Sequence, residues 1–490
     1  MSNLESYFQE FRKGVVGNDA TYDSPYGIQN IIYADWIAGG RLHKSVENQI
    51  TNVFGPFVAN THTETSETGT RMTKAYHYAQ SIIKKNVNAG PDDVIISAGF
   101  GMTAVINKLI RILGLRSCGY LSHKKCLRDS EKPVVFITHM EHHSNHTSWL
   151  ETNADVIIIP PGKGLTVDVD ELRKLLEEHK DRKFKIGAFT ACSNVTGVHA
   201  PYYELAKIMH EYNGLAFVDY AASAPYEEIN MHPADEQAKL DGIYFSPHKF
   251  LGGPGSSGIL LFDSKLYNNE IPDNPGGGTV DWTNPWNEYK YVDDIEARED
   301  GGTPGFLQMI RAALSFELKN KMGIDNILER EKELLKIAFP GMHAIPEVNI
   351  LADNIADRLG IISFYIIDIH FNLIVKLLSD RFGIQARGGC ACAGTYGHYL
   401  LEVSHEKSNE ITNKINHGDL SDKPGWVRWS LHPTMTDKEA YDFIDAIKQI
   451  IANKKEWEKD YIYDNKKNEF FHKDRPSGSI PQEIKDWFKI

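Results

Sequence analysis

Short apolar runs alternate with amphipathic stretches over the first two thirds of the chain. The runs are rich in β-branched and aromatic residues and are bounded by polar ones, which predicts buried strands. Between two of them, Leu205, Ile208, Met209 and Tyr212 recur at the spacing of one helix face. Such alternation predicts an α/β fold with a mostly parallel sheet. The predicted strands cover residues 134–138, 156–159, 186–190, 215–218 and 242–245.

The pattern changes after about residue 330, where strands and helices no longer alternate regularly. This change predicts a smaller α+β domain at the C-terminal side of the large one. Two polar segments, 116–132 and 404–424, carry no helical or strand period and are interpreted as insertions. The predicted domains are a large domain over 50–330, a small domain made of 1–49 and 331–456, and a charged tail over 457–490.

Composition narrows the class of protein. The chain has 490 residues, of which 41% are apolar and 24% charged, as in soluble globular proteins. Its 53 basic and 66 acidic residues give a net charge of −13, which argues against sequence-independent nucleic-acid binding. Its most apolar run, 361–375, contains Asp368, His370 and Asn372 and is too short for a membrane span.

Five cysteines in a chain of this length do not form a disulfide framework. The N-terminal residues contain no apolar signal core. We therefore expect a cytoplasmic protein with reduced thiols. Cys390 and Cys392 stand out because an arginine and several glycines surround them, whereas the other cysteines are expected to be inert: Cys118, Cys126 and Cys192.

Lys249 lies between two predicted apolar strands and is followed by a glycine-rich stretch. A buried ammonium group is costly, and a Schiff base with an aldehyde removes that cost. A lysine in a tight surface turn is the alternative. Asp219 ends a predicted strand, where its carboxylate is able to keep a pyridine nitrogen protonated, as pyridoxal phosphate requires. Taken alone, such an aspartate more often caps a helix or forms a turn.

A phosphate site is predicted where a strand at 94–96 leads into a helix. Free backbone N–H groups at that helix start, together with the Thr103 hydroxyl, suit a phosphate group, although Gly/Thr helix starts are common. A second cluster, at the end of the strand over 134–138, contains His139, His142, His143 and His146. Its spacing matches no standard zinc template, and an imidazole stacked on a cofactor ring explains one histidine equally well. We expect no metal.

From Tyr33 to Ala452 the sequence resembles the class V aminotransferase group of fold-type I pyridoxal phosphate (PLP) enzymes, and within it the cysteine desulfurase and selenocysteine lyase branch. The specific segments include Glu141-His142-His143, Asp219-Tyr-Ala, Ser246-Pro-His248-Lys249 and Arg387-Gly-Gly-Cys-Ala-Cys392. The resemblance implies a PLP-dependent transferase with a large domain around a mostly parallel sheet and a smaller α+β domain. It also implies a homodimer that acts on a small amino acid and passes sulfur to an acceptor protein.

The resemblance assigns roles to particular residues. Lys249 would form the Schiff base and shuttle protons, Asp219 would pair with the pyridine nitrogen, and His142 would stack on the ring. Asn194 would lie near the cofactor phenolate and the substrate. The phosphate would be held by Gly101, Met102, Thr103, Ser246 and His248, with Thr279 from a second subunit. The substrate carboxylate would be bound by Arg428 and Arg387, with His62 nearby.

The resemblance also gives Cys392 a role, as the residue that would distinguish a desulfurase from the other enzymes of this group. In desulfurases a loop cysteine attacks the substrate sulfur, retains it as a persulfide and releases alanine. Arg387 precedes Cys392 by five residues, as in the loop of that family, and a neighbouring cation favours the thiolate. Cys390 is the rival nucleophile, and the Arg-Gly-Gly-Cys-x-Cys form also resembles molybdenum-cofactor sulfurases. Both cysteines could instead be small packing residues in a glycine loop.

The sequence departs from the family pattern at three places. Ala222 stands where a Gln or His usually donates to the cofactor phenolate, and Trp36 replaces the usual Asn and is expected to narrow the substrate entrance. The insertion over 404–424 could cover the site or meet a sulfur acceptor. These departures leave open an aminotransferase, lyase or epimerase with a structural Cys392, or a cofactor-binding scaffold without turnover.

Overall fold

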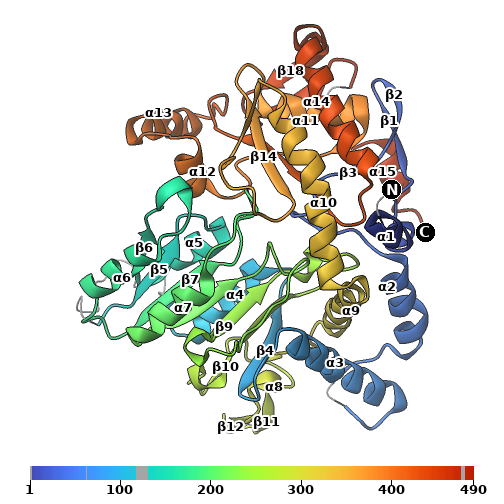
Figure 1. Ribbon diagram of the computed structural model, residues 1–490. Helices are drawn as coiled ribbons and strands as arrows, with labels where there is room; N and C mark the ends of the chain where they lie inside the picture. The colour runs from blue at the N-terminus through green and yellow to red at the C-terminus, as the bar shows by residue number, and fades with distance from the viewer. Residues whose placement is uncertain (1–2, 62, 117–130, 476–479) are drawn as a thin grey trace.

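A seven-stranded sheet forms the centre of the larger part of the molecule in the computed structural model (Figure 1), which describes residues 3–61, 63–116, 131–475 and 480–490. β10 runs antiparallel to both of its neighbours, and the remaining strands run parallel to one another. The predicted mostly parallel sheet is confirmed. Its order is β4 (Asp93–Ala98), β10 (Gly258–Asp263), β9 (Gly242–Phe245), β8 (Leu215–Asp219), β7 (Lys185–Thr190), β5 (Val134–Thr138) and β6 (Asp155–Ile159).

Helices cover both faces of this sheet, so its central strands are apolar on both sides. Alternate residues of one strand enter different cores: Phe136 of β5 packs in one, and Ile137 in the other. The first core lies against α3 (Glu67–Asn86), α6 (Val169–Glu178), α7 (Tyr202–Glu211) and α9 (Phe306–Met322). The second lies against α4 (Met102–Ile112) and α5 (His143–Leu150).

The smaller part of the molecule contains a four-stranded antiparallel sheet, joined to the larger part along the long helix α10 (Ile324–His343; Figure 1). Arg12 of the N-terminal helix α1 (Asn3–Gly14) forms two 2.8 Å hydrogen bonds with Glu439, which ties the chain start to this part. The sheet order is β13 (Val348–Ile350), β14 (Ile361–Ile366), β17 (Trp426–Ser430) and β16 (Arg387–Gly389), with α11 (Phe371–Phe382) and α14 (Asp437–Trp457) packed on it.

The segment over 404–424 contains helix α13 (His405–Asn416), so the prediction of no regular structure there is wrong. Only Ile411 of this helix is buried, and its polar faces carry no apolar stripe for the sequence pattern to reveal. The end of the segment contacts the tail, because Leu420 N–H donates to the Asn465 carbonyl at 2.9 Å. Most of the other predicted insertion, residues 117–130, lies outside the described residues.

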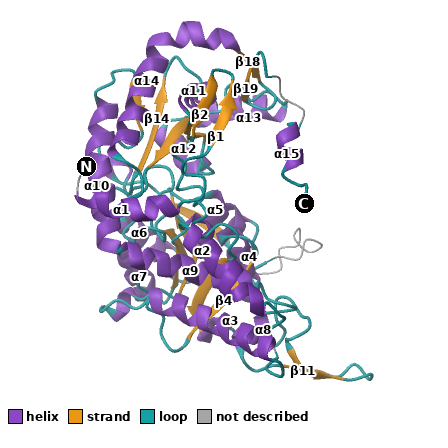
Figure 2. Cartoon of the chain, turned by 90° about the vertical axis from the view of Figure 1, so that its right-hand side faces the viewer, coloured by secondary structure: helices purple, strands orange, loops and turns teal. Residues whose placement is uncertain are grey.

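The remaining elements are short. A two-stranded hairpin of β11 (Val280–Thr283) and β12 (Tyr289–Tyr291) projects from the larger part (Figure 2). In the tail, β18 (Tyr461–Asp464) and β19 (Glu469–His472) form a second hairpin. The others are β1 (Thr21–Ser24), β2 (Gly27–Asn30), β3 (Ile32–Tyr33), β15 (Ile384–Gln385), α2 (Lys44–Asn48), α8 (Ile295–Glu299), α12 (Gly394–Leu400) and α15 (Gln482–Asp486). Across the described ranges, no helix has the length and apolarity to cross a bilayer.

Candidate active site

A cavity of about 840 Å³ opens where the parallel strands end. Its floor comes from the seven-stranded sheet, and its opposite wall comes from the smaller part of the molecule. Twelve of the predicted site residues line it: Gly101, Met102, Thr103, His142, Asn194, Asp219, Ser246, His248, Lys249, Arg387, Cys392 and Arg428. Thr279 is not among the lining residues, and His62 lies outside the described residues.

Lys249 ends a short turn directly after β9. Its backbone N–H donates to the Ser246 carbonyl at 3.0 Å, and Gly40 N–H donates to the His248 carbonyl at 2.9 Å. A Cβ at Gly40 would lie 2.0 Å from the Phe250 carbonyl oxygen, so only glycine permits this close approach. Loss of water around the Lys249 amine lowers its pKa to about 8, against the opposing charge of Asp219. About one amine in ten is therefore neutral and nucleophilic at pH 7.

Asp219 is the last residue of β8, and its side chain lies on the cavity floor. Its Oδ1 accepts the Ala221 N–H at 2.8 Å. Burial raises the pKa of this carboxyl to about 6, despite that hydrogen bond and the nearby Lys249 charge. A cation placed against Asp219 would relieve this cost, which is what a protonated pyridine nitrogen provides.

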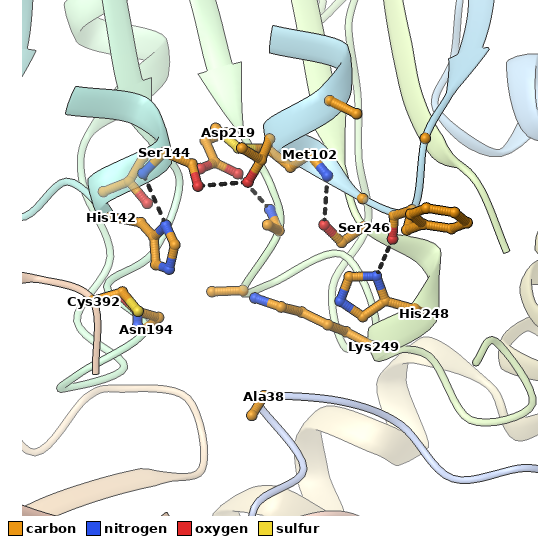
Figure 3. Close-up of a pocket in the computed structure, with 18 of the residues that line it drawn as sticks. Ala38, Met102, His142, Ser144, Asn194, Asp219, Ser246, His248, Lys249 and Cys392 are labelled. Atoms are coloured by element: carbon orange, nitrogen blue, oxygen red, sulfur yellow. Dashed lines mark hydrogen bonds between the residues drawn. The ribbon is translucent and has the colours of Figure 1, made fainter. Parts of the chain in front are cut away.

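His142 precedes α5, and its ring faces the cavity above Cys392 (Figure 3). Its Nδ1 accepts the Ser144 N–H at 3.1 Å. Burial, followed by the charge of Lys249, lowers the pKa of His142 to about 3, so the ring is neutral. The neighbouring histidines have separate partners: His139 bonds the Leu165 carbonyl, and His143 and His146 contact the loop after Cys392. Among the described residues, no three His, Cys, Asp or Glu side chains are grouped so that they could hold a metal ion.

The start of α4 forms a cradle for an anion. Ser246 Oγ accepts the Met102 N–H at 2.8 Å, and His248 Nδ1 donates to the Phe100 carbonyl at 2.8 Å. A Cβ at Gly101 would lie 2.8 Å from His248 Cε1, so a side chain there would fill the cradle. Thr103 and Ser144 share a 2.6 Å hydrogen bond across the gap between two helix starts. The N-termini of α4 and α5 thus meet where a phosphate group fits.

Two arginines face each other on the opposite wall. Arg387 of β16 pairs in register with Arg428 of β17, and both line the cavity. Arg428 is 3% exposed; its Nη2 donates to Asp35 Oδ1 at 2.8 Å and its Nη1 to the Asn194 carbonyl at 3.1 Å. Its buried Nε–H has no hydrogen-bond partner among the described residues. The sequence analysis missed Asp35, which is 393 residues away from Arg428 along the chain.

The cysteine loop closes the cavity from the same side. Ala391 and Cys392 both have positive φ angles, 49° and 57°, and Ala393 N–H donates to the Cys390 carbonyl at 3.0 Å. Asn194 Nδ2 donates to the Ala391 carbonyl at 2.7 Å. Cys392 lines the cavity that contains Lys249, whereas Cys390 lines a separate groove of about 640 Å³ beside α11 and β19. Cys192 is buried, and burial raises the pKa of its thiol well above the usual value.

Of the two residues that depart from the family pattern, Ala222 lies in the cavity lining and Trp36 does not. Ala222 lines the cavity and carries no hydrogen-bond donor. Trp36 does not narrow the entrance, so that prediction is wrong: its side chain is 4% exposed and stacks on His432 at 3.8 Å between ring centroids. The stack keeps the indole in the core of the smaller part, while the next residues, Ile37 and Ala38, reach the cavity.

The sequence profile of the aminotransferase class-V family matches residues 32–443, most of the chain. The chain belongs to the class-V aminotransferase family. It is 27% identical over 371 residues to a probable cysteine desulfurase of Halalkalibacterium halodurans, covering 74% of this chain and 84% of the relative. A probable cysteine desulfurase of Staphylococcus epidermidis is also 27% identical, over 385 residues, with coverage of 78% and 87%.

Solved structures support the fold of this member of the class-V family. The apo cysteine desulfurase from Thermococcus onnurineus superposes with a TM-score of 0.72 at 20% identity, covering 91% of this chain and 98% of that one. The cysteine desulfurase CsdA from Escherichia coli gives 0.69 at 21% identity, with the same coverage of both chains. The predicted fold-type I architecture is confirmed.

Class-V aminotransferases depend on PLP, and so does this chain. The residues of the cavity fit that cofactor by their chemistry. A partly neutral lysine suits the aldehyde, a buried carboxylate suits the pyridine nitrogen, and the cradle at two helix starts suits the phosphate.

Proposed function

We propose that this enzyme is a cysteine desulfurase that takes sulfur from L-cysteine and releases L-alanine. The observation that carries the proposal is the placement of the two loop cysteines. Cys392 shares the cavity with Lys249 and the paired arginines, whereas Cys390 faces a separate groove. The relatives named probable cysteine desulfurases support the same activity.

We assign the cofactor contacts to residues of the cavity floor. Lys249 holds the PLP aldehyde, Asp219 the pyridine nitrogen, and neutral His142 stacks on the ring. The phosphate is held by Gly101, Met102, Thr103, Ser246 and His248, and Asn194 lies by the phenolate. When bound, PLP withdraws electrons from the substrate and so stabilises negative charge that develops on it.

The protein supplies the remaining steps. Arg428 and Arg387 bind the substrate carboxylate and fix the orientation of its Cα bonds. Lys249 Nζ, once free of the aldehyde, takes the Cα proton. The Cys392 thiolate attacks the substrate sulfur, and the substrate C–S bond breaks with its electron pair moving to the carbon side. A proton added to that carbon, and a proton returned from Lys249 to Cα, give alanine, so L-cysteine and Cys392–SH become L-alanine and Cys392–S–SH.

Several finer assignments belong to the same proposal. The enzyme is a homodimer, in which Thr279 of a second copy reaches the phosphate; in its own chain Thr279 Oγ1 donates to the Gly276 carbonyl, away from the cavity lining. His62 contributes to the substrate site. L-Selenocysteine is a second substrate, and an acceptor protein removes the sulfur. The reaction needs a reduced Cys392, which favours a cytoplasmic location.

The test is the release of alanine and sulfide from L-cysteine in the presence of a thiol reductant. We expect equal amounts of both products from the native enzyme, loss of both in Cys392→Ser, and retention of both in the matched control Cys390→Ser. The cofactor absorbance should stay intact in all three proteins. Turnover of another amino acid that survives Cys392→Ser would instead identify an aminotransferase, lyase or epimerase with a structural Cys392.

A further inference from the structure

The loop that carries Cys392 is fastened to α5 at two points, the Cys392 carbonyl and the backbone N–H two residues further along, at Gly394. The backbone N–H of His143 donates to the Cys392 carbonyl at 2.7 Å, and the His143 Nε2 accepts the Gly394 N–H at 2.9 Å. One residue thus holds two points of a loop that lies about 250 positions further along the chain. We propose that His143 is a positioning residue that fixes the Cys392 loop over the cavity; the proposal rests on the desulfurase function proposed above.

Both contacts follow from the place of His143 in the fold. It is the first residue of α5, immediately after the N-capping His142, so its backbone N–H has no partner within the helix. The Cys392 carbonyl satisfies that donor. A Cβ at Gly394 would lie 3.1 Å from His143 Nε2, so the imidazole packs directly against the loop backbone. The same α5 start presents the His142 ring to the cavity, which couples loop position to the cofactor site.

The other side-chain contacts to the loop are not lost when a histidine gains a proton. Asn194 Nδ2 donates to the Ala391 carbonyl at 2.7 Å, and the Thr395 hydroxyl, 3.3 Å from His146 Nδ1, is able either to donate to that nitrogen or to accept from it. The His143 side chain differs because its Nε2 accepts the Gly394 N–H only when that nitrogen carries no proton.

The surroundings of His143 keep it neutral near pH 7. The titratable groups near it are His142 at the N-cap of α5, His146 one turn further along that helix, and Lys423 before β17, while the Cys392 carbonyl accepts its backbone N–H. Burial, and then the Lys423 charge, lower the pKa of His143 below its usual value of 6.5. The hydrogen bond to Gly394 is therefore present at neutral and alkaline pH and is lost as the pH falls through the His143 pKa, while the backbone bond to the Cys392 carbonyl remains.

The experiment measures the hydrogen exchange of the Gly394 amide in the holoenzyme, together with alanine formation from L-cysteine. In His143→Ala the Gly394 amide should exchange about 2- to 10-fold faster, because one hydrogen bond is lost. The kcat for alanine should fall by a similar factor, with KM changed less than about 2-fold because the substrate contacts remain. His143→Gln keeps an acceptor oxygen and should restore protection and turnover.

The pH dependence of Gly394 protection distinguishes a hydrogen bond to His143 Nε2 from a role of this side chain in packing alone. In the native enzyme, Gly394 protection, corrected for the intrinsic exchange rate, should fall in acid, and in His143→Gln it should stay constant over the same range. This comparison uses only the native enzyme and His143→Gln, so it still tests the proposal if His143→Ala does not fold. The control His179→Ala removes another partly buried histidine, at the end of α6 and outside the cavity lining, and should change neither readout.

Two results would overturn the proposal: unchanged Gly394 exchange in folded His143→Ala, or a pH profile of Gly394 protection that is the same in native and His143→Gln enzymes. A native enzyme that forms no alanine from L-cysteine would refute the proposed function instead. The Gly394 exchange would still test whether His143 holds the loop, so the two failures are distinguishable.

Discussion

The floor and the roof of the cavity are built in different ways. On the floor, Asp219 ends one buried parallel strand and Lys249 follows the next, and the hydrogen-bonded ladders of these strands fix their positions. The roof is a loop in which Ala391 and Cys392 adopt positive φ angles, and a few contacts from Asn194 and α5 hold it. From this contrast we expect the sheet edge to control the cofactor chemistry through burial, and the loop to control which bond of the substrate is attacked.

The largest effect should come from the floor. Lys249→Ala removes the amine to which we assign aldehyde binding and transfer of the Cα proton, and proton transfer alone contributes about 10²- to 10⁴-fold. We expect alanine release to fall by at least that factor and the absorbance of the lysine-bound cofactor to disappear. Retention of substantial turnover would show that another residue performs the proton transfer.

Arg428 lies in β17, in the wall opposite the floor, and a variant there should leave the cofactor in place. Arg428→Lys cannot keep both the Asp35 bond and the bond to the Asn194 carbonyl, and hydrogen bonds to charged groups contribute about 1.5–3 kcal/mol. We therefore expect kcat/KM for L-cysteine to fall about 10- to 100-fold with unchanged cofactor absorbance. Loss of cofactor in this variant would contradict the separation of the floor from the opposite wall.

Asp219→Asn should stabilise the apoprotein but weaken cofactor binding. Burial raises the pKa of the Asp219 carboxyl from 3.8 to about 6, so ionising it in the folded apoprotein is unfavourable. The free energy of unfolding therefore falls as the pH rises through about 4 to 6, by at most about 3 kcal/mol. The apo variant should be more stable than native at pH 7 and no different at pH 4, as measured by urea unfolding.

With cofactor bound, we expect the substitution to be unfavourable instead, because the variant lacks the anion that we assign to the pyridine nitrogen. Absorbance titration should show weaker cofactor binding and slower turnover in Asp219→Asn. An apoprotein destabilised at pH 7 would mean that the Asp219 carboxylate is already compensated by another cation.

The smallest effect on turnover is expected for Trp36→Asn, which restores the residue usual in the family. The Trp36 ring is buried against His432, and truncating a buried tryptophan costs about 3–5 kcal/mol. We expect a lower free energy of unfolding with KM for L-cysteine within about 2-fold of native. A large fall in KM would indicate that Trp36 does restrict the entrance.

The sequence predicted the floor better than the roof, for physical reasons. Buried strands have short apolar patterns, so the strands that end in Asp219 and precede Lys249 were predictable from local sequence. The helix α13 was not, because it buries almost no apolar side chain. The contacts of Arg428 with Asp35, and of His143 with Gly394, join positions hundreds of residues apart, and no local pattern encodes such partners.

The direction of a single side chain was also beyond the sequence. Trp36 and Ile37 are consecutive residues after a short edge strand, and only Ile37 reaches the cavity. Without the position of His432, 396 residues along the chain, no signal distinguishes a core tryptophan from one at an entrance.

The most direct test of the account is to map the sulfur after a single turnover without reductant. The holoenzyme is mixed with an equal amount of L-cysteine, alkylated and digested, and the loop peptide is fragmented by mass spectrometry. We predict one additional sulfur atom on Cys392, with alanine formed in equal amount, and the same result in Cys390→Ser. Alanine formed with the extra sulfur on Cys390, or with no sulfur on the loop, would contradict the assignment of Cys392 as the nucleophile.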